Sequence, residues 1–96
     1  MARKEGFGKV VVNGKTMTQK MYKQSVVDTF NELNNSWLST DTVISYASNK
    51  GWVEKKNRNR KAHSHPLYRI MTYMCESDNT LEWRFNKRGI LEYRMR

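Results

Sequence analysis

The hydrophobic pattern of the last sixteen residues, 81–96, is the most regular in the chain. If Lys87-Arg88-Gly89 form a three-residue loop with Gly89 in the left-handed conformation, the flanking segments become two antiparallel strands in one register. In that register one face is wholly apolar and the other pairs opposite charges, and a slip of one residue would destroy both patterns. The facing residues are Leu81 and Met95, Trp83 and Tyr93, Phe85 and Leu91 on the apolar face, and Glu82 and Arg94, Arg84 and Glu92 on the charged face. The pattern predicts a C-terminal β-hairpin with a basic tip.

A second hairpin signal lies near the start of the chain. Asn13-Gly14 stands between short segments that contain β-branched residues, and Asn-Gly is the dipeptide that a two-residue hairpin turn favours most. Residues 1–9 combine basic side chains with two glycines, which is typical of a mobile basic arm. We therefore predict a basic arm and a short N-terminal β-ribbon over residues 1–17, followed by the main domain over residues 18–96.

Two helices are predicted after the ribbon, because apolar residues recur there every three or four positions. The first covers residues 18–34, and the residues on its apolar face are Tyr22, Val26, Phe30 and Leu33. Trp37-Leu38 form a short extended piece. A second helix over residues 39–50 follows, which Ser39 or Thr40 can cap. Its apolar residues are Val43, Ile44 and Ala47.

The segment 66–77 has two interpretations. Its apolar residues match the helical spacing i, i+3, i+4, i+7, and Pro66 is well placed at a helix start. These apolar residues are Leu67, Ile70, Met71 and Met74. Alternatively, residues 52–56 and 67–73 are two strands of a wing, which would make 40–49 the recognition helix. We favour the helix, because strand alternation would not separate apolar from polar side chains here.

The resulting order of elements, α-β-α-α-β-β, resembles the winged helix-turn-helix family over residues 18–96. The resemblance implies an α+β fold with three helices and a C-terminal β-hairpin wing. It also implies that the helix 66–77 lies in a DNA major groove, while Lys87 and Arg88 reach a neighbouring backbone or minor groove. The chain departs from the family in the connection between its two middle helices, which is about fifteen residues long instead of a tight turn. That long connection, 52–65, supplies an additional basic loop.

Composition narrows the choice of partner. Eighteen Lys and Arg against nine Asp and Glu give a formal net charge of +9 over 96 residues, which favours a polyanionic partner and above all nucleic acid. No apolar run is long enough for a membrane-spanning helix, and the N-terminus has no signal-peptide core. With Cys75 as the only cysteine, no internal disulfide can form, and we expect a cytoplasmic protein of a bacterium or a phage-infected cell.

Two groups of residues are candidates for contact with DNA. The predicted outward face of the helix 66–77 offers side chains that can bond base edges or phosphate, namely Tyr68, Arg69, Thr72 and Tyr73. Basic residues of the loop and of the hairpin tip are the expected phosphate contacts, namely Lys55, Lys56, Arg58, Arg60, Lys61, Lys87 and Arg88. Glu76 would repel phosphate, so contacts should concentrate in the first two turns of the helix.

The sequence gives no reason to expect catalysis, a metal or a cofactor. Glycine-rich phosphate loops, metal-binding His/Glu helices and nucleophile elbows are missing, and the acidic residues are too scattered for a two-metal nuclease. His63, His65 and Cys75 lack a fourth ligand for a zinc site, and we expect the histidines to start a helix or to contact phosphate.

These observations predict a non-enzymatic protein that binds double-stranded DNA and regulates transcription or genome maintenance. One alternative is a protein-interaction module that binds a host enzyme such as RNA polymerase through the wing, Tyr68 and Tyr73. The other is RNA binding through the basic loop, since arginine-rich segments often order on RNA. Only residues 1–17 lie outside the predicted DNA-binding unit, so we expect a monomer or a weak homodimer.

Overall fold

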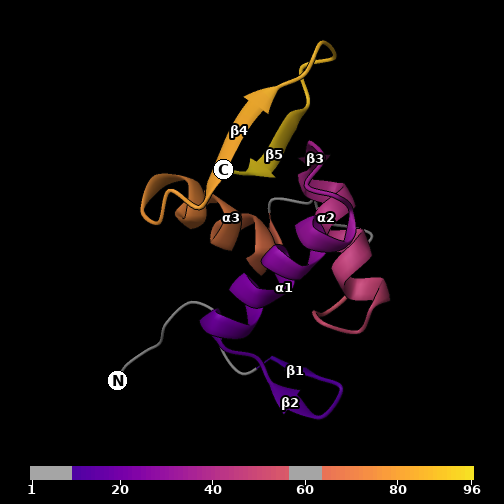
Figure 1. Cartoon of the computed structure of the whole chain (residues 1–96). Helices are drawn as coiled ribbons and strands as arrows, with labels where there is room; N and C mark the ends of the chain where they lie inside the picture. The colour runs from indigo at the N-terminus through magenta and orange to yellow at the C-terminus, as the bar shows by residue number, and fades with distance from the viewer. Residues whose placement is uncertain (1–9, 57–63) are drawn as a thin grey trace.

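The computed structural model describes residues 10–56 and 64–96. Within these ranges the chain is an α+β fold of three helices and two small antiparallel sheets (Figure 1). The elements in chain order are β1 (Val11–Val12), β2 (Lys15–Thr16), α1 (Gln19–Glu32), β3 (Leu38–Ser39), α2 (Thr40–Asn49), α3 (Pro66–Glu76), β4 (Leu81–Phe85) and β5 (Leu91–Met95).

The C-terminal hairpin has the predicted register at every position. Strands β4 and β5 pair from Leu81 with Met95 to Phe85 with Leu91, and Gly89 has a φ of +78°. The side chain of Asn86 stabilises the tip, because its Oδ1 accepts hydrogen bonds from the backbone N–H groups of Arg88 and Ile90 at 2.8 and 3.1 Å. The alternation of apolar and charged residues was therefore sufficient to define this element.

The same hairpin belongs to a three-stranded sheet. Its order is β3-β5-β4, with Leu38 opposite Tyr93 and Ser39 opposite Glu92. The extended piece predicted at Trp37-Leu38 thus begins one residue later. Asn35 continues the pairing through its side chain, which donates to the Met95 carbonyl at 3.0 Å and accepts from the Met95 N–H at 2.8 Å. Strand β4 is left at the edge of the sheet.

Helices α1 and α2 form as predicted, with one difference at the end of α1. Thr18 and Ser39 are their N-caps, and each side chain accepts the N–H of the residue three positions later at 3.2 Å. The predicted α1 core residues Tyr22, Val26 and Phe30 are buried, but Leu33 is only partly buried. The reason is that Leu33 is the C-cap, where the backbone leaves the helical path.

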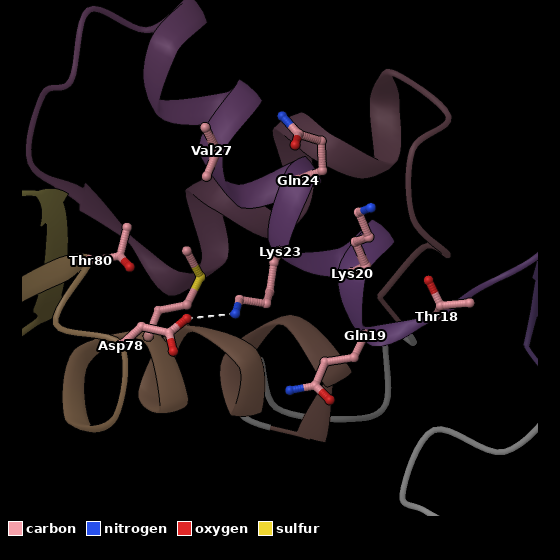
Figure 2. Close-up of a pocket in the computed structure, with 9 residues that line it drawn as sticks. Thr18, Gln19, Lys20, Lys23, Gln24, Val27, Asp78 and Thr80 are labelled. Carbon is pink, nitrogen blue, oxygen red and sulfur yellow. Dashed lines mark ion pairs between the residues drawn. The ribbon is translucent and has the colours of Figure 1, made fainter.

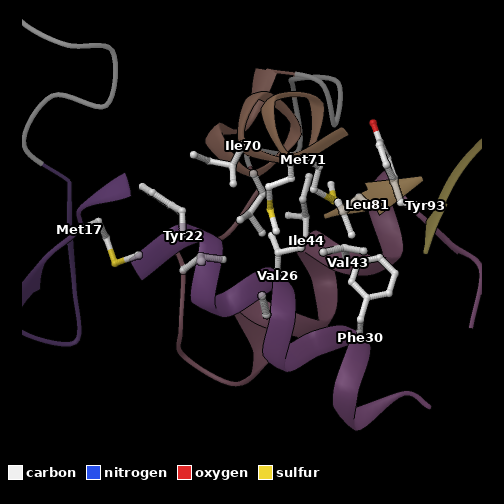
Figure 3. Packing of buried hydrophobic residues seen from close by; sticks show 14 residues of the cluster. Met17, Tyr22, Val26, Phe30, Val43, Ile44, Ile70, Met71, Leu81 and Tyr93 are labelled. Carbon is white, nitrogen blue, oxygen red and sulfur yellow. The ribbon is translucent and has the colours of Figure 1, made fainter. Parts of the chain in front are cut away.

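Residues 66–76 form helix α3, so the helical interpretation of this segment is confirmed. The competing wing of strands 52–56 and 67–73 is wrong, because residues 52–56 contain no strand. The four apolar residues of α3 are buried against α1, α2 and β4, and Figure 3 shows Ile70 and Met71 packed with Val26 and Ile44. This packing fixes which side of α3 faces outward.

The N-terminal ribbon is attached at the opposite end of the molecule from the C-terminal hairpin (Figure 1). Strands β1 and β2 pair through an Asn13-Gly14 turn with φ values of 51° and 79°. The Asn13 side chain donates to the Gly51 carbonyl at 2.7 Å, and Met17 is buried at the start of α1. The predicted arm, residues 1–9, lies outside the described residues.

No helix within residues 10–56 and 64–96 combines the length and the apolar character that crossing a membrane requires.

Candidate nucleic-acid interface

The four side chains predicted to share the outward face of α3 point in three directions. Tyr68 and Thr72 face the β4–β5 hairpin, and both line a hollow between the helix and the hairpin. Arg69 is exposed on the outward side. Tyr73 lies on the opposite flank, toward α1, with the ammonium of Lys23 5.2 Å from its ring centre. The four residues thus share the side of α3 that is not buried, but they spread from its hairpin flank to its α1 flank, and their contact with DNA stays a prediction.

The hollow between α3 and the hairpin has a volume of about 200 Å³ and a largely apolar lining. Helix α3 contributes Thr72 and Cys75 to it, and the hairpin contributes the exposed rings of Trp83 and Phe85. These two rings pack edge to face, with centroids 5.5 Å apart, and extend beyond the core that buries Leu81. On β4 the apolar face of the hairpin is thus buried only at Leu81, at its base.

Tyr93 fixes the position of α3 relative to the hairpin. It is 2 % exposed on β5, and the hydroxyl groups of Thr40 and Thr72 lie near its own. Burial raises the pKa of Tyr93 to about 12, against the opposing effect of these two hydroxyl groups. The phenol is therefore neutral at physiological pH and connects β5, the start of α2 and the middle of α3.

The cations of the hairpin divide into paired and unpaired sets. Arg84 and Arg94 form ion pairs with Glu92 and Glu82 at 3.0 and 2.7 Å, and both guanidinium groups stack on Trp37 at 4.2 and 4.6 Å from its ring centre. Lys87 and Arg88 at the tip are exposed, and neither takes part in an ion pair with a described residue. The tip therefore offers two cations that a phosphate could neutralise.

The two described lysines of the basic connection differ in the same way. Lys55 is exposed, whereas Lys56 forms an ion pair of 2.6 Å with Asp41 in the first turn of α2. A phosphate would therefore have to compete with the Asp41 carboxylate for Lys56, which weakens the predicted role of this lysine. The other predicted contacts of this connection, Arg58, Arg60 and Lys61, lie outside the described residues.

Glu54 anchors the start of this connection, a role that the sequence did not reveal. Its carboxylate accepts the hydroxyl of the buried Tyr22 at 2.9 and 3.0 Å, and its backbone carbonyl lies 2.8 Å from Nε2 of His65. Burial and the nearby carboxylate raise the pKa of Tyr22 well above its ordinary value. Residues 54 and 65 are thereby held together at the N-terminus of α3.

His65 is the N-cap of α3 and uses both ring nitrogens. Nδ1 accepts the N–H of Leu67 at 3.1 Å, which leaves the proton on Nε2 for the Glu54 carbonyl. The helix-start role expected of His65 is confirmed, while His63 lies outside the described residues. Among the residues that the structure describes, no group of three His, Cys, Asp or Glu side chains is arranged to hold a metal.

A larger hollow lies elsewhere on the described surface, and none of the predicted site residues lines it. Figure 2 shows this hollow beside α1, with the Lys23–Asp78 ion pair of 2.6 Å spanning from α1 to the turn after α3. The pair holds the end of α3 against α1. We therefore assign this region to the support of α3 and not to ligand binding.

Comparison with known proteins returned no match to any family model, curated protein or solved structure. The case for a function therefore comes from the geometry described above.

Proposed function

We propose that this chain is a winged helix-turn-helix protein that binds double-stranded DNA, with α3 as the recognition helix and the β4–β5 hairpin as the wing. The observation that carries the proposal is the joint position of α3 and the hairpin. One side of α3 is sealed in the core, its opposite side carries Arg69, and the adjoining hairpin ends in the two cations Lys87 and Arg88. The order of α1, β3, α2, α3, β4 and β5, with β3 paired to β5, supports the same assignment.

The outward side of α3 suits the major groove. An α-helix with side chains is about 10–12 Å wide, which matches a groove of about 12 Å. Arg69, in the first turn, can form a bidentate bond with guanine. Glu76 is exposed in the last turn and would repel phosphate, so the N-terminal half of α3 is the end that enters the groove.

The wing tip and the basic connection would bind the DNA backbone. Lys87 and Arg88 at the tip and Lys55 in the connection are exposed cations, and each phosphate that a cation neutralises releases counterions. Such contacts give affinity without sequence preference and make binding depend on salt. A chain with this combination would act by occupying duplex sites, as a regulator of transcription or genome maintenance does.

Duplex DNA is a better partner for this shape than duplex RNA. The major groove of A-form RNA is deep and narrow and does not admit a helix, so α3 could not reach base edges there. The test is a titration of labelled duplex DNA, single-stranded DNA and duplex RNA at two salt concentrations. We expect duplex DNA to bind tightest and to lose affinity steeply with salt. Equal binding of the three nucleic acids, or tighter binding of RNA, would overturn the proposal.

A further inference from the structure

Strand β4 has an open edge. The sheet order β3-β5-β4 places β5 on one side of β4, and no described strand pairs with its other side. Figure 1 shows the upper half of β4 standing clear of the helices on that side. An exposed edge strand with apolar side chains is a template for pairing with another chain unless charge, proline or a bulge protects it.

The backbone groups at this edge belong to the apolar residues of the strand. Hydrogen bonds that bracket the hairpin join Asn86 to Ile90 and Arg96 to Thr80. Because bonding directions alternate along antiparallel strands, the even-numbered residues of β4 direct their N–H and C=O groups toward β5. Those of Leu81, Trp83 and Phe85 therefore point outward. Trp83 and Phe85 are also 55 % and 62 % exposed, which is unusual for rings of this size.

We propose that two copies of this chain associate through their β4 edges, antiparallel and with a two-fold axis at Trp83. In this register Trp83 lies opposite Trp83 of the second copy, and Leu81 lies opposite Phe85. Glu82 then faces Arg84 of the second copy, and Arg84 faces its Glu82. The strand LEWRF is thus complementary to itself in both side-chain character and charge.

The charges select this register from its neighbours. A shift of two residues, which keeps the outward backbone groups aligned, places either Glu82 opposite Glu82 or Arg84 opposite Arg84. Like charges directly opposite each other destabilise a strand pair. In the proposed register the ion pairs within each hairpin extend into one row, in the order Glu92, Arg84, then Glu82 and Arg94 of the second copy. Every neighbour in that row has the opposite charge.

The paired edges would form a six-stranded sheet with both aromatic faces on the same side. The hollows beside the two α3 helices would lie on that side too, related by the two-fold axis.

This arrangement goes beyond the proposed DNA binding and does not depend on it. If both hold, the preferred DNA site is a palindrome, because protein and DNA symmetry then coincide. An edge of five residues is short against a standard interface, so we expect a weak dimer.

Cysteine exchange tests the register directly. In a Cys75→Ser background, one variant carries Glu82→Cys and a second variant carries Arg84→Cys. Three samples are oxidised: each variant alone, and an equal mixture of the two. In the proposed register, position 82 of one copy and position 84 of the other face each other without backbone hydrogen bonds between them. In such a pair the Cα atoms are about 4.5 Å apart, a distance that a disulfide can span. We expect disulfide-linked dimers in the mixture, containing one chain of each kind, and few in either chain alone. Equal linking in all three samples, or none in the mixture, would overturn the register.

Sedimentation of the unmodified chain, from about 1 μM to about 1 mM and without nucleic acid, tests the association itself. We expect a monomer–dimer equilibrium that Trp83→Lys weakens by about tenfold or more, since a charge at the axis faces its own copy. Ile90→Lys is the matched control, because Ile90 is 44 % exposed on the same hairpin but outside β4. A monomer at every concentration would refute the dimer, whatever the outcome of the DNA titration. Equal weakening by the two variants would refute the β4 edge as the interface.

Discussion

Removal of the two charges at the hairpin tip should change the salt dependence of DNA binding by a calculable amount. If Lys87 and Arg88 each neutralise one phosphate, the double variant Lys87→Gln/Arg88→Gln should have a slope of log affinity against log salt that is shallower by about 1.8, at about 0.9 for each contact. Between about 50 and 200 mM salt this difference corresponds to about twelvefold, so the variant should lose about twelvefold less affinity than the unmodified chain. The tip itself should keep its shape, because Asn86 holds it through backbone N–H groups.

The assay is a fluorescence titration of a labelled duplex at several salt concentrations. Lys15→Gln/Lys20→Gln is the control, because it removes the same two charges from exposed positions in β2 and at the start of α1, near the end of the molecule opposite the tip. We expect the control to keep the slope of the unmodified chain. If both variants flatten the slope equally, the effect comes from net charge, and the tip does not contact the backbone.

Three further predictions concern the basic connection and the core. The variant Arg58→Gln/Arg60→Gln/Lys61→Gln should weaken binding to all duplexes about equally and flatten the dependence of affinity on salt. An unchanged salt dependence would show that this connection does not contact DNA. His65→Ala should lower the free energy of unfolding by about 1–3 kcal/mol through loss of the helix cap and the bond to the preceding segment, and His65→Asn, which can still cap, should lose less in urea unfolding. The pKa of Tyr93 is about 12 in the folded state and about 10 in the unfolded state. The neutral phenol therefore contributes its full share of the free energy of unfolding below pH about 10, and this share is lost as the pH rises through about 12. Tyr93→Phe should therefore unfold with a weaker dependence on pH above 10, and an unchanged dependence would show that Tyr93 is not responsible.

The sequence predicted those elements whose two faces differ in chemistry over consecutive residues. The β4–β5 register followed from alternation that sorts apolar from charged residues on both strands, and α3 followed from apolar residues at helical spacing. Alternation did not reveal that Trp83 and Phe85 would be exposed. It assigns side chains to a common face but does not show how much of that face the helices cover.

The contacts that organise the candidate site join residues far apart in the chain, and no local pattern predicts them. Tyr22 and Glu54 are 32 positions apart, yet their hydrogen bond anchors the start of the basic connection. The contact of Lys23 with Tyr73 places that tyrosine on the α1 flank of α3. Such contacts depend on how α1 packs against α3, which the sequence pattern leaves open.

The most direct test of the recognition-helix proposal is the effect of Arg69 variants on two duplexes. One duplex is selected from a random pool by the unmodified chain, and the other is a scrambled version of it. Arg69→Ala should cost about 1–3 kcal/mol more on the selected duplex than on the scrambled one, and Arg69→Lys should lose the same selectivity while it keeps the salt slope. Thermal melting of each variant verifies that the compared proteins are folded. A selective loss on the chosen duplex is the result that the proposal predicts, and equal losses on both duplexes would contradict it.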